Sequence, residues 1–484
     1  MESCTPLDHV ISAPGYRLDT VSPDDPQEYD TVSGSSFATP LVAGTAALIR
    51  GEWPYLSAAE VVTILLDTAD RDFDGYAKTK HGAGVLDAEA ALSPQGAMSV
   101  PSSADVRAGG DPLATTALFA GPAFGDGFAR AAGALDDAIA VDRYARDFRV
   151  DLGVTVAAPP AGEWVFAERV GRLGAARHAG RRDGDGYAVS HYQSGNRAEL
   201  AAIGVLDGWS FTAGGMHARG ARPLSWGPPV PLLSAAYTEP ATAAEMNHLE
   251  AAVSGGAGAL GFAPGVHARV ARHEHHAVGE LPGEEVNAFT AGVHFERRRE
   301  DGAGALRVVL EQRAGDEGLW GTRTSGAFEH GAESTQAARV EFERRFRGLE
   351  FRLGVERAVT HVSGTGTLLD GMEGIESSVG YALGAVPVPG GVAVLGISQP
   401  RRVESGEVVL DVPVGVSAAG EVEREVRRVP VSPSGRQVDV ELAYLLDVGD
   451  RGHAQFHVVR SREPGHVASQ PSQTAVGVGL ALRY

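Results

Sequence analysis

One serine of this 484-residue chain lies in a segment whose residue types and spacing suit a catalytic nucleophile. Ser36 lies in Gly34-Ser35-Ser36-Phe37-Ala38-Thr39-Pro40, directly before a run rich in leucine, valine and alanine. Gly34 permits a tight turn before the serine, and a serine in a first helical turn lies beside backbone N–H groups that have no partner within the helix. Such N–H groups can stabilise an oxyanion. The segment therefore predicts a nucleophile for acyl transfer.

The residues after Ser36 predict a helix that is apolar on nearly all sides. Leucine, valine, isoleucine and alanine fill most positions from 41 to 49, and Gly44 allows close packing. Pro40 fits a first helical turn, where a missing N–H costs nothing. We expect the helix to end near Arg50 and to lie inside a large core, because it offers solvent no polar face.

Four segments in register resemble the subtilisin-like serine peptidases, the subtilases. The segment around Ser36 is similar to their G-T-S-x-A-x-P nucleophile motif, with Ser35 in place of the usual threonine. Three more segments agree with the family in order: Ser12-Ala13-Pro14-Gly15, Ser57-Ala58-Ala59-Glu60 before an apolar helix, and Gly82-Ala83-Gly84-Val85-Leu86-Asp87-Ala88. The resemblance implies that residues 1–94 are the C-terminal part of a subtilisin-like α/β catalytic domain. It also implies a serine endopeptidase that cleaves protein or peptide substrates through an acyl-enzyme on Ser36.

The family's other catalytic groups have no matching motif in this sequence. Subtilases carry their aspartate, histidine and oxyanion asparagine before the serine, and 35 residues precede Ser36 here. His9, Asp8, Asp19 and Asp30 lie in that stretch, but none in a motif of the family. Without a base the serine proton has no acceptor, so we expect a truncated domain that is inactive alone. Three explanations for the truncation stay open: an incomplete reading frame, a domain whose other half is supplied separately, and an inert remnant.

Composition narrows the remaining classes of protein. A net charge of −20 argues against a nucleic-acid partner, which needs a basic surface. The single cysteine, Cys4, can form no internal disulfide, which fits both a cytosolic protein and a bacterial export product. No apolar run approaches the roughly 18 residues of a helical membrane span. The polar start, Met1–Pro6, predicts no signal peptide in this chain.

Two short patterns are weak candidates for metal ions. Residues 70–75, Asp-Arg-Asp-Phe-Asp-Gly, have the opening of a calcium loop, but its twelfth position is His81 instead of a bidentate glutamate. Residues 273–276, His-Glu-His-His, are consecutive and alternate between the two faces of an expected strand. We therefore expect no metal and no other cofactor, with calcium at residues 70–75 as the alternative.

Beyond a Ser/Ala/Gly/Pro-rich stretch, the chain predicts antiparallel strands. We expect a linker over residues 95–141 and a β-rich domain over residues 142–484. Apolar and charged residues alternate in several segments: 306–311, 340–346, 349–356, 407–414 and 438–444. A period of two repeated so often is typical of antiparallel sheet. The predicted fold class is thus multidomain, a truncated α/β piece followed by a large antiparallel all-β domain.

Two architectures produce such alternation. A soluble sandwich buries the apolar faces between two sheets, whereas a transmembrane barrel turns them outward to lipid. Residues 474–484 favour the barrel, because they alternate strictly over the length of a barrel strand and end in the aromatic Tyr484.

A last strand with a terminal aromatic residue resembles the bacterial outer-membrane barrels. A subtilase segment before such a region resembles the autotransporter subtilases, in which a C-terminal barrel anchors or delivers the peptidase. The resemblance implies the bacterial outer membrane or the cell surface. The alternative is a non-catalytic outer-membrane or surface β-protein with a vestigial peptidase remnant.

Overall fold

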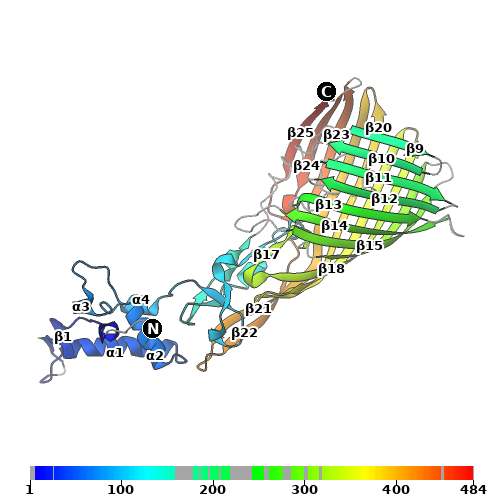
Figure 1. Ribbon diagram of the computed structural model, residues 1–484. Coiled ribbons are helices and arrows are strands. Elements are labelled where there is room, and N and C mark those ends of the chain that lie inside the picture. The colour runs from blue at the N-terminus through cyan, green and yellow to red at the C-terminus, as the bar shows by residue number, and fades with distance from the viewer. Residues whose placement is uncertain are drawn as a thin grey trace. The chain divides into compact units, whose positions relative to one another are not determined.

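The computed structural model describes most of the chain. Its described residues are 6–25, 27–157, 178–184, 187–194, 197–206, 209–218, 243–254, 261–275, 285–298, 303–315, 319–448 and 452–482. The chain forms two compact units (Figure 1). Unit 1 comprises Met1–Thr115, Asp137–Asp151 and Val412–Glu425, and unit 2 comprises Thr116–Asp136, Leu152–Asp411 and Val426–Tyr484. None of the described helices combines the length and the apolar composition that a membrane crossing requires.

Each unit takes up part of the expected linker, residues 95–141. These residues form short elements, among them β5 (Ala117–Phe119) and α5 (Phe128–Gly133) of unit 2. Strand β5 pairs with β17 (Arg323–Ser325) and with β8 (Val156–Ala157) in a small sheet. The boundaries at residues 94 and 141 stay predictions, because the units group residues by contact and not by order along the chain.

A 16-stranded antiparallel sheet dominates unit 2 (Figure 1). Its first eight strands are β9 (His178–Gly184), β10 (Tyr187–Ser194), β11 (Arg197–Leu206), β12 (Trp209–Ala218), β13 (Ala243–Ser254), β14 (Ala263–His275), β15 (Glu285–Arg298) and β16 (Gly304–Gly315). The others are β18 (His330–Phe346), β19 (Leu349–Gly364), β20 (Leu369–Val388), β21 (Gly391–Val416), β22 (Val422–Pro430), β23 (Val438–Val448), β24 (Gly452–Arg462) and β25 (Gln473–Leu482). Strand β22 pairs only with β21, and the remaining strands follow one another from β9 to β25. The predicted class, an α/β piece followed by a large antiparallel sheet, is confirmed.

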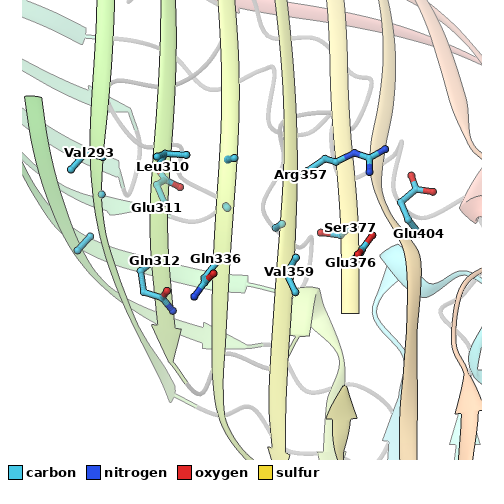
Figure 2. Close-up of a pocket in the computed structure, with 15 residues that line it drawn as sticks. Val293, Leu310, Glu311, Gln312, Gln336, Arg357, Val359, Glu376, Ser377 and Glu404 are labelled. Atoms are coloured by element: carbon cyan, nitrogen blue, oxygen red, sulfur yellow. The ribbon is translucent and has the colours of Figure 1, made fainter. Parts of the chain in front are cut away.

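Small side chains at paired positions leave space on the sheet. The backbone register aligns Gly292, Glu311, Ala337, Ala358 and Ser377 on five consecutive strands. A cavity of about 670 Å³ lies against this row, and Figure 2 shows the side chains that line it. Four of the five residues are small, so Glu311 is the one long side chain of the row.

The described residues of unit 1 include four α-helices, two small sheets and the adjoining ends of β21 and β22. The helices are α1 (Ser35–Glu52), α2 (Ala58–Asp67), α3 (Lys78–His81) and α4 (Ala88–Leu92). Strands β1 (Leu18–Val21) and β2 (Tyr29–Val32) form a hairpin before α1. The second sheet has the order β4 (Gly110–Pro112), β3 (Ser99–Pro101), β6 (Ala138–Val141) and β7 (Asp147–Val150).

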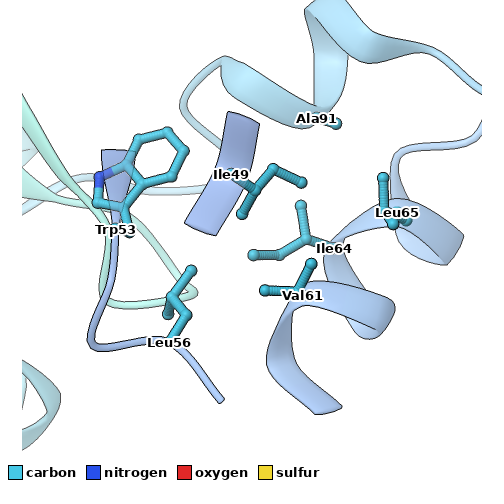
Figure 3. Close-up of a cluster of buried hydrophobic side chains, with 7 residues drawn as sticks. All are labelled: Ile49, Trp53, Leu56, Val61, Ile64, Leu65 and Ala91. Carbon is cyan, nitrogen blue, oxygen red and sulfur yellow. The ribbon is translucent and has the colours of Figure 1, made fainter. Parts of the chain in front are cut away.

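The core of unit 1 lies where α1, α2 and α4 meet (Figure 3). Its buried members are apolar: Ile49, Trp53, Leu56, Val61, Ile64, Leu65 and Ala91. Helix α2 enters the core through one apolar side, as the spacing of Val61, Ile64 and Leu65 predicts for an amphipathic helix.

A buried arginine joins the β6–β7 hairpin to these helices. Arg146 has no exposed side-chain surface, and its Nη2 donates to Asp142 Oδ2 at 2.7 Å and to the Ser93 carbonyl oxygen at 2.9 Å. Its guanidinium carbon lies 4.8 Å from the ring centre of Trp53. Because Ser93 is the C-cap of α4, this one side chain contacts the hairpin, α4 and the end of α1.

Candidate functional site

Ser36 is the second residue of α1, and its side chain is exposed. Gly34 is the N-cap, with φ 159° and ψ 151°, and its carbonyl oxygen accepts a hydrogen bond from Phe37 N–H at 3.0 Å. A Cβ atom on Gly34 would lie 3.3 Å from Ser36 Oγ. The glycine therefore leaves room beside the hydroxyl, at the end of the helix where backbone N–H groups are free. The expected position of Ser36 is found, and its catalytic role stays a prediction.

The Ser12–Gly15 segment supports the turn before Ser36. Gly34 N–H donates to the Gly15 carbonyl oxygen at 2.7 Å. A Cβ atom on Gly15 would lie 3.0 Å from the Gly34 carbonyl oxygen and 3.4 Å from Ala38 Cβ. The two glycines are thus needed because the two turns approach each other closely.

The segment of residues 82–88 packs beside the Ser12–Gly15 segment. Ser12 N–H donates to the Gly84 carbonyl oxygen at 2.9 Å, and Leu86 N–H donates to the Ser12 carbonyl oxygen at 2.7 Å. Gly84 has φ +144°, and a Cβ atom there would lie 2.6 Å from the Asp70 carbonyl oxygen. Segments that are 70 residues apart in sequence therefore form one support for the turn that carries Ser36.

Helix α2 begins with a capping box. Ser57 N–H donates to Glu60 Oε2 at 2.6 Å, and Glu60 N–H donates to Ser57 Oγ at 3.3 Å. The Ser57 backbone N–H holds the pKa of the Glu60 carboxyl below its usual value, and Arg107 nearby adds to this effect. The ionised form of Glu60 is therefore the one that caps the helix.

The prediction that α1 is buried is wrong for this chain. Helices α2 and α4 cover one side of α1, where Thr45 and Ile49 are buried. On the uncovered side Leu41 is 41% exposed and Leu48 is 57% exposed. No charged residue occurs in α1 before Arg50. The composition suits a buried helix, but the described residues pack against only part of it.

Pro40 lies further into the helix than expected. It is the sixth residue of α1, inside the helix and beyond the first turn. A proline at that position removes the N–H that would donate to the Ser36 carbonyl oxygen four residues earlier. The Ser36 carbonyl therefore lacks its regular helical partner.

The two faces of the large sheet have opposite character. Along β19 the side chains of Leu353, Val355 and Val359 are exposed, while Gly354, Glu356, Ala358 and Thr360 between them are buried. The same inversion occurs on other strands, where apolar side chains are exposed: Val266, Phe295, Leu310, Val340, Phe342, Leu395, Ile397, Val440, Leu442, Phe456, Val458, Val476 and Val478. We call these the outer face and the opposite side the inner face.

Ion pairs fill the inner face. Glu356 is 3% exposed and accepts from Arg339 Nη2 at 2.7 Å, from Arg313 Nη2 at 3.0 Å and from Arg401. Arg313 Nη2 also donates to Glu311 Oε2 at 2.6 Å. A buried network of charged side chains is stable only where every charge has a partner of opposite sign. This network was not predicted from the sequence, although its signal is present there as glutamates and arginines at every second position of these strands.

Comparison with known proteins follows the same division of the chain. The model of the subtilase family (peptidase family S8) matches residues 3–85. Mycosin-3 of Mycobacterium tuberculosis is 41% identical over 96 residues, which cover 17% of this chain and 20% of that protein. Subtilisin DY of Bacillus licheniformis is 37% identical over 81 residues, which cover 17% of this chain and 28% of that protein. The chain thus spans less than a third of the length of these two relatives.

Solved structures similar to this chain overlap it more widely but at low identity. The ferric-catecholate import receptor Fiu of E. coli K12 covers 68% of this chain, with 59% of its own length, 9% identity and a TM-score of 0.33. The toluene transporter TodX of Pseudomonas putida covers 63% of this chain, with 86% of its own length, 9% identity and a TM-score of 0.26.

The segment that matches the subtilase family brings no base or acid to Ser36 among the residues that the structure describes. Ser36 Oγ has no hydrogen bond to an imidazole or carboxylate there. His9 is exposed at the end of the 3₁₀ helix η1 (Pro6–His9), and Asp8 pairs with Lys78. Asp19 Oδ1 accepts from Thr31 Oγ1 at 2.8 Å within the β1–β2 hairpin. Asp8 and Asp19 therefore serve local structure.

The metal candidates gain no support in the described part of the chain. Asp70 Oδ1 accepts from Asp72 N–H at 2.8 Å, which stabilises the turn itself. No group of three or more histidine, cysteine, aspartate or glutamate side chains suited to a metal ion occurs among the described residues. His276, and the side chains of the neighbouring His273 and His275, lie outside the description, as does the expected terminal aromatic residue, Tyr484.

Proposed function

We propose that this chain is the serine-bearing part of a subtilisin-like endopeptidase, carried by a β-barrel in a bacterial outer membrane. The observation that carries the peptidase assignment is Ser36, exposed in the first turn of an apolar helix within the segment that matches the subtilase family. Protein or peptide substrates follow from the family, not from contacts in this chain.

The chain supplies one part of the surroundings that acyl transfer requires, the N–H groups for the oxyanion. In this mechanism Ser36 Oγ attacks the carbonyl carbon of a peptide bond, its proton passes to a base, and the carbonyl oxygen becomes an oxyanion. The free N–H groups at the start of α1 suit that oxyanion. A base, an acid and a second oxyanion donor must come from polypeptide beyond the family match. Without the base, a triad of this type loses about 10⁶-fold in kcat.

The inverted faces of the sheet support the membrane location. Exposed leucine, valine and phenylalanine side chains are costly in water and favourable in lipid. The buried ion pairs of the inner face would be costly in lipid and fit a polar barrel interior. A soluble sandwich would bury the apolar face between two sheets, and this sheet exposes it instead.

Labelling with a fluorophosphonate probe tests the peptidase assignment. Cells that make the chain from its own locus are treated with the probe, and the adduct is located by mass spectrometry. We expect the adduct on Ser36 and none in a Ser36→Ala strain. An unlabelled Ser36 in cells that contain the chain would contradict the peptidase assignment and favour a non-catalytic β-protein.

That second candidate rests on a specific observation. Ser36 has no base or acid bonded to it in the described residues, while the sheet has the surface of a membrane protein regardless of Ser36. The location is tested by electrophoresis of membrane fractions with and without heating. We expect the unheated chain to migrate differently from the heated chain, as a folded barrel does, and identical migration would contradict the barrel.

A further inference from the structure

The two ends of the large sheet have connections of different length. At one end short turns predominate, with Arg347-Gly348 between β18 and β19 and Pro389-Gly390 between β20 and β21, although eight residues join β13 to β14 there. At the other end residues 316–329 join β16 to β18, and residues 463–472 join β24 to β25. Outer-membrane barrels place short turns on the periplasmic side. We call the end with the two-residue turns the short-turn rim.

Arginines on the inner face at this rim are each paired with glutamate. Arg345 Nε lies 3.3 Å from Glu350 Oε2, and Arg352 Nε lies 2.6 Å from Glu350 Oε1. Arg298 pairs with Glu296. These side chains therefore neutralise one another within the chain.

Arginines on the outer face of the same rim are not paired with glutamate among the described contacts. Arg297 and Arg344 are one residue before paired inner arginines in sequence, so they point to the opposite side of the sheet. They continue the outer rows of Phe295 and Phe342. Together with Arg347 in the turn, they make no hydrogen bond or ion pair among the described contacts.

Two of these arginines contact aromatic rings, and the third lies opposite one in the strand register. The Arg347 guanidinium lies 5.1 Å from the ring centre of Phe346, and that of Arg297 lies 5.9 Å from the ring centre of Phe262. Arg344 stands opposite Phe351 in the β18–β19 register. Aromatic and basic side chains gather at the level of lipid headgroups, below the apolar belt of a membrane protein.

We propose that Arg297, Arg344 and Arg347 bind the phosphate groups of anionic phospholipid headgroups at the short-turn rim. This inference rests on the proposed membrane location. A guanidinium matches phosphate through paired hydrogen bonds, and no carboxylate pairs with these three cations among the contacts of the described residues. The chain neutralises its inner arginines with its own glutamates and leaves the outer ones for an anion that the bilayer supplies. The contact fixes the depth of the rim in one leaflet.

Lipid retention by the purified barrel tests this proposal. The full chain is inserted into liposomes that contain phosphatidylcholine and phosphatidylglycerol, extracted in mild detergent and analysed for bound lipid by native mass spectrometry. The test variant carries Arg297→Gln, Arg344→Gln and Arg347→Gln. The control variant removes three exposed arginines of unit 1, by Arg17→Gln, Arg50→Gln and Arg149→Gln, and so has the same net charge.

We expect the wild type and the control to retain phosphatidylglycerol over phosphatidylcholine. The test variant should lose this preference, by about fivefold for each arginine that contacts the headgroup region. Equal retention by all three proteins would overturn the proposal. So would displacement of the lipid by inorganic phosphate at the same phosphate concentration, which would indicate a site for free anions.

Electrophoresis with and without heating, together with insertion into liposomes, distinguishes a wrong headgroup site from a wrong membrane location. The test variant should still migrate differently when unheated, because its substitutions lie at the rim and not in the paired network. If the wild type itself does not insert into liposomes, the membrane location fails. If it inserts without preference for the anionic lipid, the location stands and the headgroup site is wrong.

Discussion

Helix α1 of unit 1 and the outer face of the large sheet expose similar apolar side chains, yet what lies behind them differs. Leu48 on α1 is 57% exposed and Leu442 on β23 is 56% exposed. Behind α1 lies an apolar core that includes Ile49 and Ile64. Behind Leu442, the neighbouring inner residue Glu441 is fully buried and bonded to His457 at 2.8 Å.

The difference shows that exposure alone does not identify the medium that an apolar surface requires. An element that is apolar on all sides has the composition of an interior helix in a larger domain. An element that is apolar outside and charged inside has the composition of a barrel wall in lipid. The same exposed leucine therefore has a different meaning in the two regions.

Loss of Arg146 should have the largest effect on unit 1. Arg146→Met keeps much of the packing but leaves Asp142 buried without its cation, which costs about 3–5 kcal/mol. Hydrogen exchange of the full chain should accelerate in α4 and in the β6–β7 hairpin, with no change in the sheet of unit 2. Arg149→Met, at an exposed position of the same hairpin, should change stability by less than about 0.5 kcal/mol. Equal effects of the two substitutions would contradict the role of the buried pair.

A matched pair of substitutions tests the comparison itself. Leu442→Arg places a charge on the outer face, where the proposed lipid contact would make it cost about 2–4 kcal/mol. Leu48→Arg, at equal exposure on α1, should cost less than about 0.5 kcal/mol, because arginine is also a good helix former. Urea titration of the chain in lipid vesicles measures the first, and hydrogen exchange of α1 measures the second. A tolerated Leu442→Arg would mean that the outer face meets water.

Acid should weaken unit 2 before it weakens the start of α2. Burial lowers the pKa of His466 to about 4, and the neutral ring accepts from Gln437 N–H at 3.0 Å and bonds the Arg401 carbonyl oxygen at 2.9 Å. The unfolded state binds the proton more readily, so stability is present above the ordinary histidine pKa and falls as the pH drops from about 6.5 toward 4. By pH 5 the loss should reach about 2 kcal/mol.

The pH dependence of unfolding measures this effect. His466→Gln should flatten the slope between pH 5 and pH 7, and an unchanged slope would assign it to other histidines of unit 2. The capping box of α2 should stay intact over the same range. Because the pKa of Glu60 is lowered, its contribution is lost only when the pH falls through that lowered value.

Much of this arrangement could be predicted from the sequence because its causes are local. The turn before Ser36, the capping box and the alternation of the strands depend on residues a few positions apart. The partial exposure of α1 could not be predicted, because apolar composition states what a helix prefers and not what the chain supplies around it. Arg146 was missed for a similar reason, since its partner Ser93 lies 53 residues away and is chosen by tertiary packing.

The smallest predicted effect belongs to the cap of α2 and shows how far a local change should spread. Ser57→Ala removes the acceptor for Glu60 N–H and should cost about 1 kcal/mol, while Ser57→Asp retains an acceptor and should cost less. Hydrogen exchange should rise in the first turn of α2 and leave β23 and β24 unchanged, because these strands belong to unit 2. Faster exchange in β23 or β24 would contradict the division into two units, since it would couple the apolar core behind α1 to the buried charges of the large sheet.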